Sequence, residues 1–180
     1  MPDPRIIRDK YCSTATGYDE LYREEQFEKY EVVFNEHRPK GVVADVGAGT
    51  CLLEEYFVTR NILSSVLYIL ALDLTPCMLD LCRERLSKLN VMHLVDIVEC
   101  DAVHLPLRDN SVDESYAFTV FDLVSDAEKA IREQVRVTRK RAIYTLLKRA
   151  EAHRRFSLCQ RYHGETSKDV ICSPRAFNSN

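Results

Sequence analysis

The sequence predicts an α/β protein in which helices cover a doubly wound, mostly parallel sheet. Apolar runs of strand length alternate with amphipathic stretches of helical length, which is typical of this class. A Gly-x-Gly turn, Gly47 to Gly49, joins the first strand to a helix, and the acids Asp45, Asp73 and Asp101 each end a strand. Right-handed crossovers bring the carboxyl ends of parallel strands to one edge, where ligands bind.

The chain has 180 residues, of which 46% are hydrophobic and 29% charged, as expected for one globular domain over 1–180. A net charge of -3 argues against nucleic-acid binding through overall charge alone. The apolar run 61–74 is too short to span a bilayer, and the N-terminus lacks a signal-peptide core. The expected parts are an irregular segment 1–17, a helix 18–38, a ligand-binding core 41–148, and a C-terminal helix with a short strand over 149–180.

The first half of the chain begins with a helix over 19–37, where Leu21, Phe27 and Phe34 fall on one face before Pro39. A strand over 41–46 and a helix over 50–59 flank the glycine turn. The continuous apolar run 65–73 is typical of a strand buried on both faces. Thr75 and Pro76 suit the N-cap and first position of a helix that runs to about residue 89.

The second half of the chain continues the alternation, with a turn at Asn110–Ser111. The expected elements are a strand over 91–99, a strand over 112–120, a helix over 126–138, a strand over 141–148, a helix over 150–162 and a last strand over 169–172.

The seven cysteines are odd in number, and none forms a Cys-x-x-Cys pair. We therefore expect free thiols in a reducing cytoplasm and no zinc site. The cysteines are Cys12, Cys51, Cys77, Cys82, Cys100, Cys159 and Cys172.

The glycine turn does not match two common phosphate-binding motifs. Leu52 stands where the dinucleotide motif has its third glycine, and no Gly-Lys-Ser/Thr follows as in a Walker loop. Asp45 would repel a pyrophosphate but would attract a cation. An acid such as Asp73, placed after the second strand, can accept both ribose hydroxyls. An adenosine with a cationic tail, S-adenosylmethionine, fits this pattern, although two glycines after a strand are also common in plain tight turns.

Four segments carry a resemblance to the class I S-adenosylmethionine-dependent methyltransferases over roughly residues 18–148. Asp45-Val-Gly47-Ala-Gly49-Thr-Cys51 resembles their D-x-G-x-G-x-G motif, and the segments beginning at Leu72, Glu99 and Ser111 resemble their next three motifs. Tyr18-Asp-Glu-Leu-Tyr22 resembles a segment that folds over the cofactor in the quinone-biosynthesis branch; tRNA methyltransferases are further relatives. The resemblance implies a Rossmann-like fold and cofactor contacts from Asp45, Gly47, Ala48, Gly49, Asp73, Leu74, Asp101, Ala102 and Phe118.

The chain departs from the family pattern in three places, one of which is Thr138-Arg-Lys-Arg141 in place of the usual Lys-Pro-Gly-Gly turn before the fifth strand. Cys51 replaces the third motif glycine and is expected to add bulk near the methionine part of the cofactor. After the fifth strand, few residues remain for the closing strands, so we expect a single last strand or a shortened sheet.

Methyl transfer needs an aligned nucleophile and no covalent enzyme intermediate. Asp122, just past the fourth strand, is the candidate to orient an acceptor or act as base; the alternative is that it starts a loop and caps the next helix. His104 is a further rim residue, more typical of an exposed loop.

The acceptor expected from the sequence is RNA or a protein, because few closing elements surround the site. The segment 132–161 is rich in Arg and Lys, which suits RNA or an acidic protein but also a solvated helix face. The apolar third strand, 93–99, is an edge on which a small activator protein could pair. The alternatives are a small-molecule acceptor and a non-catalytic partner-binding module; we expect no membrane association.

Overall fold

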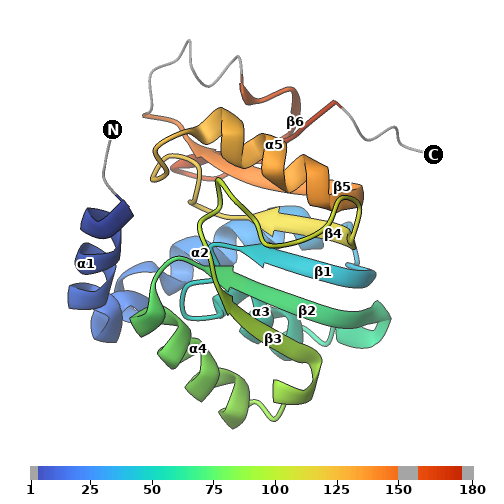
Figure 1. Cartoon of the computed structure of the whole chain (residues 1–180). Helices are drawn as coiled ribbons and strands as arrows, with labels where there is room; N and C mark the ends of the chain where they lie inside the picture. Colours follow the sequence, from blue (N-terminus) through green and yellow to red (C-terminus); the bar gives the residue numbers. More distant parts are fainter. Residues whose placement is uncertain (1–3, 150–157, 176–180) are drawn as a thin grey trace.

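The computed structural model describes residues 4–149 and 158–175 and has a seven-stranded sheet in the order β3-β2-β1-β4-β5-β7-β6 (Figure 1). The first five strands in the chain pair in parallel, and the last two pair antiparallel. The expected doubly wound, Rossmann-like α/β class is therefore confirmed. The strands are β1 (Gly41–Val46), β2 (Val66–Asp73), β3 (Val95–Glu99), β4 (Val112–Ala117), β5 (Thr138–Leu147), β6 (Arg161–Glu165) and β7 (Asp169–Ser173).

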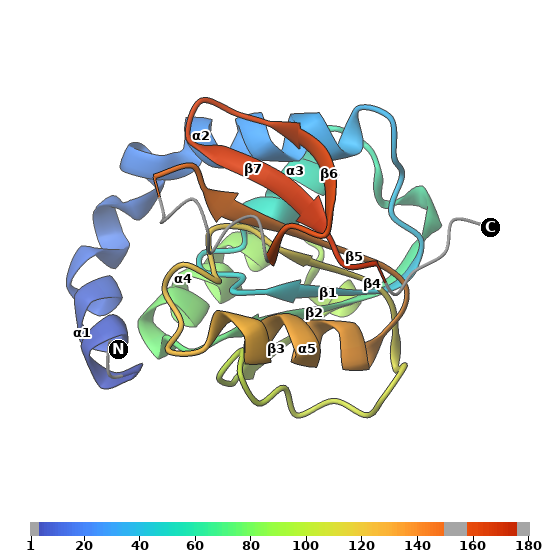
Figure 2. The same ribbon diagram turned by 90° about the horizontal axis from the view of Figure 1, so that it is seen from above.

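Helices lie on both faces of the sheet (Figure 2). One hydrophobic core joins α2, α3 and α4 to one face, and a second joins α5 and the segment after β3 to the other. Phe57 and Tyr116 are fully buried in the first core and Tyr144 in the second, each worth about 1.5–3 kcal/mol of burial. The helices are α1 (Pro4–Thr14), α2 (Tyr18–Phe34), α3 (Leu52–Thr59), α4 (Pro76–Lys88) and α5 (Ala127–Val137).

The N-terminal segment is helical, so the expectation of an irregular segment over 1–17 was wrong. Helix α1 and a short 3₁₀ turn (Ala15–Gly17) precede α2, and α1 packs against α4 at the carboxyl edge of the sheet (Figure 1). Helix α1 has only 11 residues. Its contacts with distant residues stabilise it, as is common for short helices.

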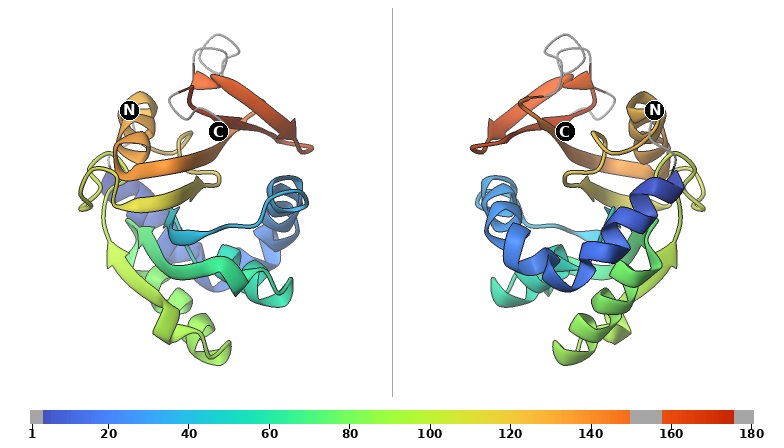
Figure 3. Two further views of the ribbon diagram at one scale, coloured as in Figure 1. Left: turned by 90° about the vertical axis from the view of Figure 1, so that its right-hand side faces the viewer. Right: turned by 90° about the vertical axis from the view of Figure 1, so that its left-hand side faces the viewer.

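The C-terminal part also differs from expectation. Residues 150–157 lie outside the described residues, but Arg161 and Tyr162, expected at the end of a helix, belong to β6. The last strand is not alone: β6 and β7 form an antiparallel hairpin, and β7 pairs with β5. The hairpin completes the sheet at the edge opposite β3 (Figure 3).

The edge strand β3 is shorter than predicted, because Met92–Leu94 form a 3₁₀ turn before it. Leu94 and Ile97 are only half-buried, as expected beside an edge strand that pairs with β2 on one side and with no strand on the other. Within 4–149 and 158–175, no helix is both long and apolar enough to cross a membrane.

Candidate active site

A cleft lies at the carboxyl ends of β1, β2 and β4 and encloses about 810 Å³, counting space open to solvent. A smaller cleft adjoins it and shares Tyr18, Gly47, Gly49 and Phe118 with it. Between them, the two clefts contain all nine residues expected at the cofactor: Gly47, Gly49, Asp73, Leu74, Asp101, Ala102 and Phe118 in the main cleft, and Asp45 and Ala48 in the smaller one.

The glycine turn has the left-handed backbone that its sequence predicts. Gly47 has φ +77 and Gly49 φ +53, values that side chains disfavour. A Cβ on Gly47 would lie 2.3 Å from Cγ2 of Val120, so glycine is required there by the packing. A Cβ on Gly49 would meet only Cε of Met78 at 3.7 Å and a backbone oxygen at 4.0 Å, so this residue faces open space.

Asp73 ends β2 and anchors the turn. Its Oδ2 accepts a hydrogen bond from the Gly49 N–H at 2.8 Å, and its Oδ1 accepts one from the Thr75 N–H at 2.8 Å. Burial raises the pKa of Asp73, and these hydrogen bonds oppose the shift. Asp73 also lines the main cleft, where a carboxylate can accept hydrogen bonds from the hydroxyl groups of a ligand.

Asp101 follows β3 and lines the same cleft as Asp73. Its Oδ1 accepts a hydrogen bond from the Val103 N–H at 3.0 Å, which holds the loop after the strand. Cys100, beside it, is buried enough that its pKa rises to about 12, so the thiol stays neutral. The strand ends thus bring both acids to one cleft, as the register of a parallel sheet requires.

Asp45 and Glu54 are two buried carboxyl groups that interact electrostatically. Asp45 is 4% exposed and Glu54 1%. Burial is the main cause that raises the pKa of both groups, that of Glu54 to about 7, and the charge of Glu54 further raises the pKa of Asp45. Neither Glu54 oxygen has a hydrogen-bond partner among the described residues. The sequence analysis missed Glu54, although an acid between apolar residues of α3 was a signal of burial.

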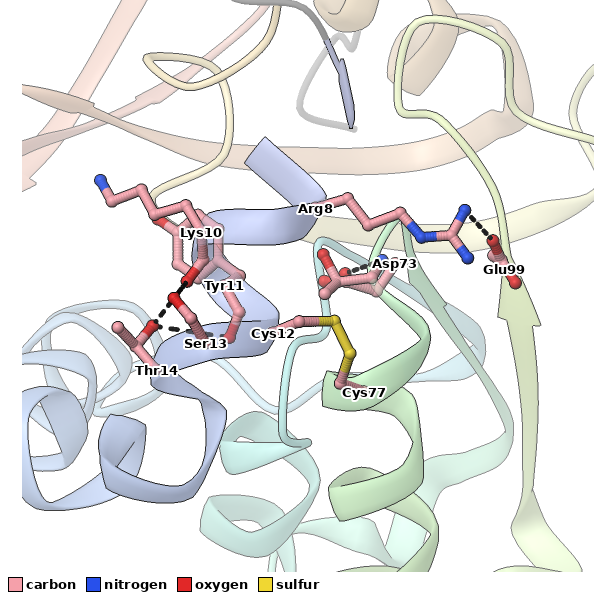
Figure 4. Close-up of a disulfide and its surroundings, with 10 residues drawn as sticks. Arg8, Lys10, Tyr11, Cys12, Ser13, Thr14, Asp73, Cys77 and Glu99 are labelled. Carbon is pink, nitrogen blue, oxygen red and sulfur yellow. Dashed lines mark hydrogen bonds and ion pairs between the residues drawn. A yellow bond between two sulfur atoms is a disulfide. The ribbon is translucent and has the colours of Figure 1, made fainter. Parts of the chain in front are cut away.

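Helix α1 lines one side of the main cleft with Ile7 and Tyr11. A disulfide joins Cys12 to Cys77 at the start of α4, close to Asp73 (Figure 4). Arg8 pairs with Glu99 at 3.2 Å, which ties α1 to the end of β3. The chain therefore supplies its own cover for this cleft, contrary to the expectation that closing elements were few.

The cysteines are mostly paired, so the expectation of free thiols was wrong. Three disulfides join Cys12–Cys77, Cys51–Cys82 and Cys159–Cys172, and Cys100 is the free cysteine of the described residues. The pairing depends on contacts between elements far apart in sequence, which residue spacing does not reveal. The expectation of a cytoplasmic location rested on free thiols and loses that support. No group of metal-binding side chains occurs within the described ranges.

Cys51 does not narrow the cleft as expected. It has a left-handed backbone with φ 62, is fully buried, and bonds to Cys82 of α4. It is absent from the lining of both clefts. Its bulk therefore lies on the α4 side of the turn.

The candidate base Asp122 lies outside the lining of both clefts. Its Oδ2 accepts a hydrogen bond from the Leu147 N–H at 2.8 Å, so it holds the end of β5. The cap of α5 is Asp126, whose Oδ1 accepts from the Lys129 N–H at 2.9 Å. His104 is exposed and contacts the Lys129 ammonium. Of the expected candidates, Tyr18 lines both clefts, whereas Tyr22 is 39% exposed and lines neither.

Comparison with known families gives one match by a family model. A family model described as a methyltransferase domain matches residues 44–146. The chain belongs to this methyltransferase domain family. It is an S-adenosylmethionine-dependent methyltransferase, and the cofactor expected from its motifs is confirmed. No curated protein sequence matches the chain.

Several solved methyltransferase structures share the fold. The S-adenosylmethionine-dependent methyltransferase from Aquifex aeolicus is 21% identical, with TM-score 0.68, and the match covers 96% of this chain and 97% of that one. Magnesium protoporphyrin IX methyltransferase from Synechocystis, solved with bound cofactor, is 15% identical, with TM-score 0.72 and 96% of each chain covered. A Haloferax volcanii protein assigned as a methyltransferase, in complex with the Trm112 activator, is 19% identical, with TM-score 0.60; 75% of this chain and 58% of that one are covered.

The residues of the methyltransferase cleft fit S-adenosylmethionine. Gly49 leaves open space where the backbone must approach a ligand. Asp45, a buried carboxyl group that lines the smaller cleft, suits a cationic group. Asp73 lines the cleft with a carboxylate, which is a hydrogen-bond acceptor of the kind that ribose hydroxyls require.

Proposed function

We propose that this methyltransferase holds S-adenosylmethionine between the glycine turn, Asp73 and Asp101, and methylates a small acceptor with an apolar body. When bound, this cofactor supplies a methyl group activated by its positively charged sulfur. The observation that carries the proposal is the apolar cover of the cleft, contributed by Ile7 and Tyr11 of α1 on one side and by Leu123 and Val124 on the other.

The roles of the acids follow from their places at the strand ends. Asp73 accepts hydrogen bonds from the ribose, and Asp101 meets the adenine amino group. Asp45, Gly47, Ala48 and Gly49 surround the methionine part. Leu74, Ala102 and Phe118 supply apolar contacts beside these polar ones.

The acceptor is small because α1 limits access to the cleft. The sequence favoured RNA or a protein, since a cover for the site was not visible in it. Part of the basic segment that suggested RNA is neutralised: Arg136 pairs with Asp109 and Glu133, and Lys140 pairs with Asp113. Paired cations have less free charge to offer to phosphates, so this segment supports the small-molecule alternative.

Two measurements test the proposal. S-adenosylhomocysteine should raise the melting temperature of the protein, by an amount that grows with ligand concentration. Asp73→Ala should weaken its binding by about 1.5–3 kcal/mol, the scale of a hydrogen bond to a charged group. No thermal shift at millimolar ligand would contradict the cofactor site.

The acceptor class is tested with methyl-labelled cofactor and a cell extract divided by size. The label should enter the low-molecular-mass fraction. Label in RNA or protein instead would restore the acceptor class that the sequence alone favoured.

A second candidate function is supported by the open edge at β3. Ile97 and Leu94 are half-buried there, and the Haloferax volcanii relative was solved with an activator protein. In this alternative, a small activator pairs with β3 and completes a site for a larger acceptor.

A further inference from the structure

A cluster of buried polar side chains lies between α2, the end of β4 and the start of β7. Lys29 of α2 is 0% exposed, and its ammonium contacts three acceptors. The Nζ atom lies 2.5 Å from Oγ1 of Thr119, 3.0 Å from Oε1 of Glu25 and 3.0 Å from Oδ2 of Asp169. The contacts with Thr119 and Glu25 are hydrogen bonds, and the contact with Asp169 is an ion pair.

Thr119 is the member of this cluster that lines the main cleft. It follows β4 with φ 60, in the left-handed region that β-branched residues rarely adopt. Its N–H donates to Oγ1 of Thr145 at 2.8 Å, which holds this conformation. Such strained residues persist where the surroundings enforce them, and they occur often at active sites.

The hydroxyl of Thr119 still has its proton to donate in a hydrogen bond. Its oxygen accepts hydrogen bonds from Lys29 and, at 3.2 Å, from Nε2 of Gln26, and these use both lone pairs. Its proton must therefore be donated, and within the part of the chain that the structure describes no acceptor takes it. Thr119 lines the main cleft, so a ligand bound there is the acceptor to which this proton can be donated.

The cleft also contains few groups that could remove a proton from an acceptor. Burial raises the pKa of Tyr11 to about 12 and raises that of Tyr18 further, so both stay protonated. The Cys100 thiol stays neutral for the same reason. Asp73 and Asp101 are the remaining titratable residues of the lining, and the proposed function assigns both to the cofactor.

We infer that the acceptor carries an ionised oxygen, a phenolate or a carboxylate, and that Thr119 donates a hydrogen bond to that oxygen. This inference rests on the proposed function and narrows its acceptor. The acceptor loses its proton to water before transfer. The carbon–sulfur bond of the methyl group then breaks with its electron pair on sulfur, and an oxygen–carbon bond forms. The anion and the sulfonium become a neutral ether or ester and a neutral thioether.

Thr119 orients and stabilises the anion, and Lys29 and Gln26 are positioning residues. Lys29 and Gln26 donate hydrogen bonds to the Thr119 oxygen. These hydrogen bonds leave the Thr119 proton to the cleft and make the Thr119 hydroxyl a stronger donor. An amine acceptor would gain nothing from the Thr119 donor, because a hydrogen bond from Thr119 would occupy the lone pair with which the amine attacks the methyl group.

The test uses three probes with the same apolar body: 4-nitrophenol, 4-nitrobenzoic acid and 4-nitrobenzylamine. The full-length protein is first saturated with S-adenosylhomocysteine, whose binding is measured by calorimetry. Absorbance then follows the ionisation of bound 4-nitrophenol with pH. A hydrogen bond to the anion should lower its apparent pKa by about one unit, a tenfold shift in ionisation.

Thr119→Val keeps the shape and β-branching but removes the donor, so it should abolish the shift; Thr119→Ser should restore it. Both variants should bind S-adenosylhomocysteine as the unchanged protein does. With methyl-labelled cofactor, the phenol and the acid should be methylated, and Thr119→Val should lower kcat about tenfold at an unchanged KM for the cofactor.

The outcomes separate the two proposals. No binding of S-adenosylhomocysteine contradicts the proposed function itself. If S-adenosylhomocysteine binds but the pKa of bound 4-nitrophenol is equal in the unchanged protein and in Thr119→Val, the inference is overturned and the proposed function stands. Methylation of the amine in preference to the acids, or binding of none of the three probes, also overturns it.

Discussion

Gly47 and Gly49 share a left-handed backbone but differ in what surrounds them. A methyl group on Gly47 would collide with Val120, whereas on Gly49 it would enter open cleft space. Gly49→Ala should cost about 1–2 kcal/mol of stability from backbone strain, and it should weaken S-adenosylhomocysteine binding at least about tenfold by occupying ligand space. Chemical denaturation and calorimetry measure the two effects.

The matched control is Gly47→Ala, which should destabilise the protein more than Gly49→Ala, because its methyl group meets Val120. Adding Val120→Ala should recover part of that loss. Unchanged cofactor affinity in Gly49→Ala would show that the ligand does not approach this turn.

Glu54 should make stability depend on pH. Its pKa is about 7 in the folded protein, above the ordinary value near 4.5, so the folded state binds the extra proton between these values. The free energy of unfolding therefore falls as pH rises from about 4.5 to 7 and stays low above it, by up to about 3 kcal/mol. Glu54→Gln should flatten this dependence and should be more stable than the unchanged protein at pH 8, as measured by denaturation from pH 5 to 8.

Glu55→Gln is the control for this experiment, because the neighbouring carboxylate pairs with Arg23 at 2.5 Å and with Arg85 at 3.1 Å. It should lower stability without flattening the pH dependence. Equal pH profiles for Glu54→Gln and the unchanged protein would show that Glu54 ionises normally in the fold.

At the scale of elements, one disulfide attaches α1 to α4 beside the cleft. The Cys12–Cys77 disulfide closes a sequence separation of 65 residues, and loop entropy assigns such a link about 4 kcal/mol. Cys12→Ser should lower the melting temperature and weaken S-adenosylhomocysteine binding, because Ile7 and Tyr11 would leave the cleft more easily. A dithiol reductant, which reduces all three disulfides, should lower the melting temperature of the unchanged protein further than Cys12→Ser does.

Cys159→Ser provides a matched loss of a disulfide away from α1. It should lower the melting temperature through the Cys159–Cys172 link and leave cofactor affinity unchanged. Equal affinities in both cysteine variants would mean that α1 does not close the cleft.

At the scale of the whole molecule, β3 is the open edge of the sheet. Ile97→Lys should break any complex with an activator on this edge, while it changes the stability of the monomer by about 1 kcal/mol or less. Co-expression with a small zinc-binding activator from the same cell, followed by size-exclusion chromatography, measures the complex. Leu67→Lys, at an apolar side chain that is 72% exposed on β2, is the control and should leave the complex intact.

A monomer that is fully active alone and indifferent to Ile97→Lys would remove the activator candidate. It would also favour the small acceptor, for which α1 suffices as a cover.

The sequence by itself determined the strands around the site, the glycine turn and the acids at the strand ends. These features are local: a strand is recognised from its apolar run, a turn from its glycines, and the common edge from the handedness of the crossovers. Asp45, Asp73 and Asp101 could thus be placed together without coordinates.

Tertiary structure alone decided what closes and completes the site. Helix α1, the Cys12–Cys77 link and the β6–β7 hairpin depend on partners distant in the chain, which local patterns do not contain. The same holds for Lys29 and Thr119, which are 90 residues apart and meet because α2 crosses the end of β4. Local propensity predicts elements, but the long-range packing of side chains decides which residues face the cleft.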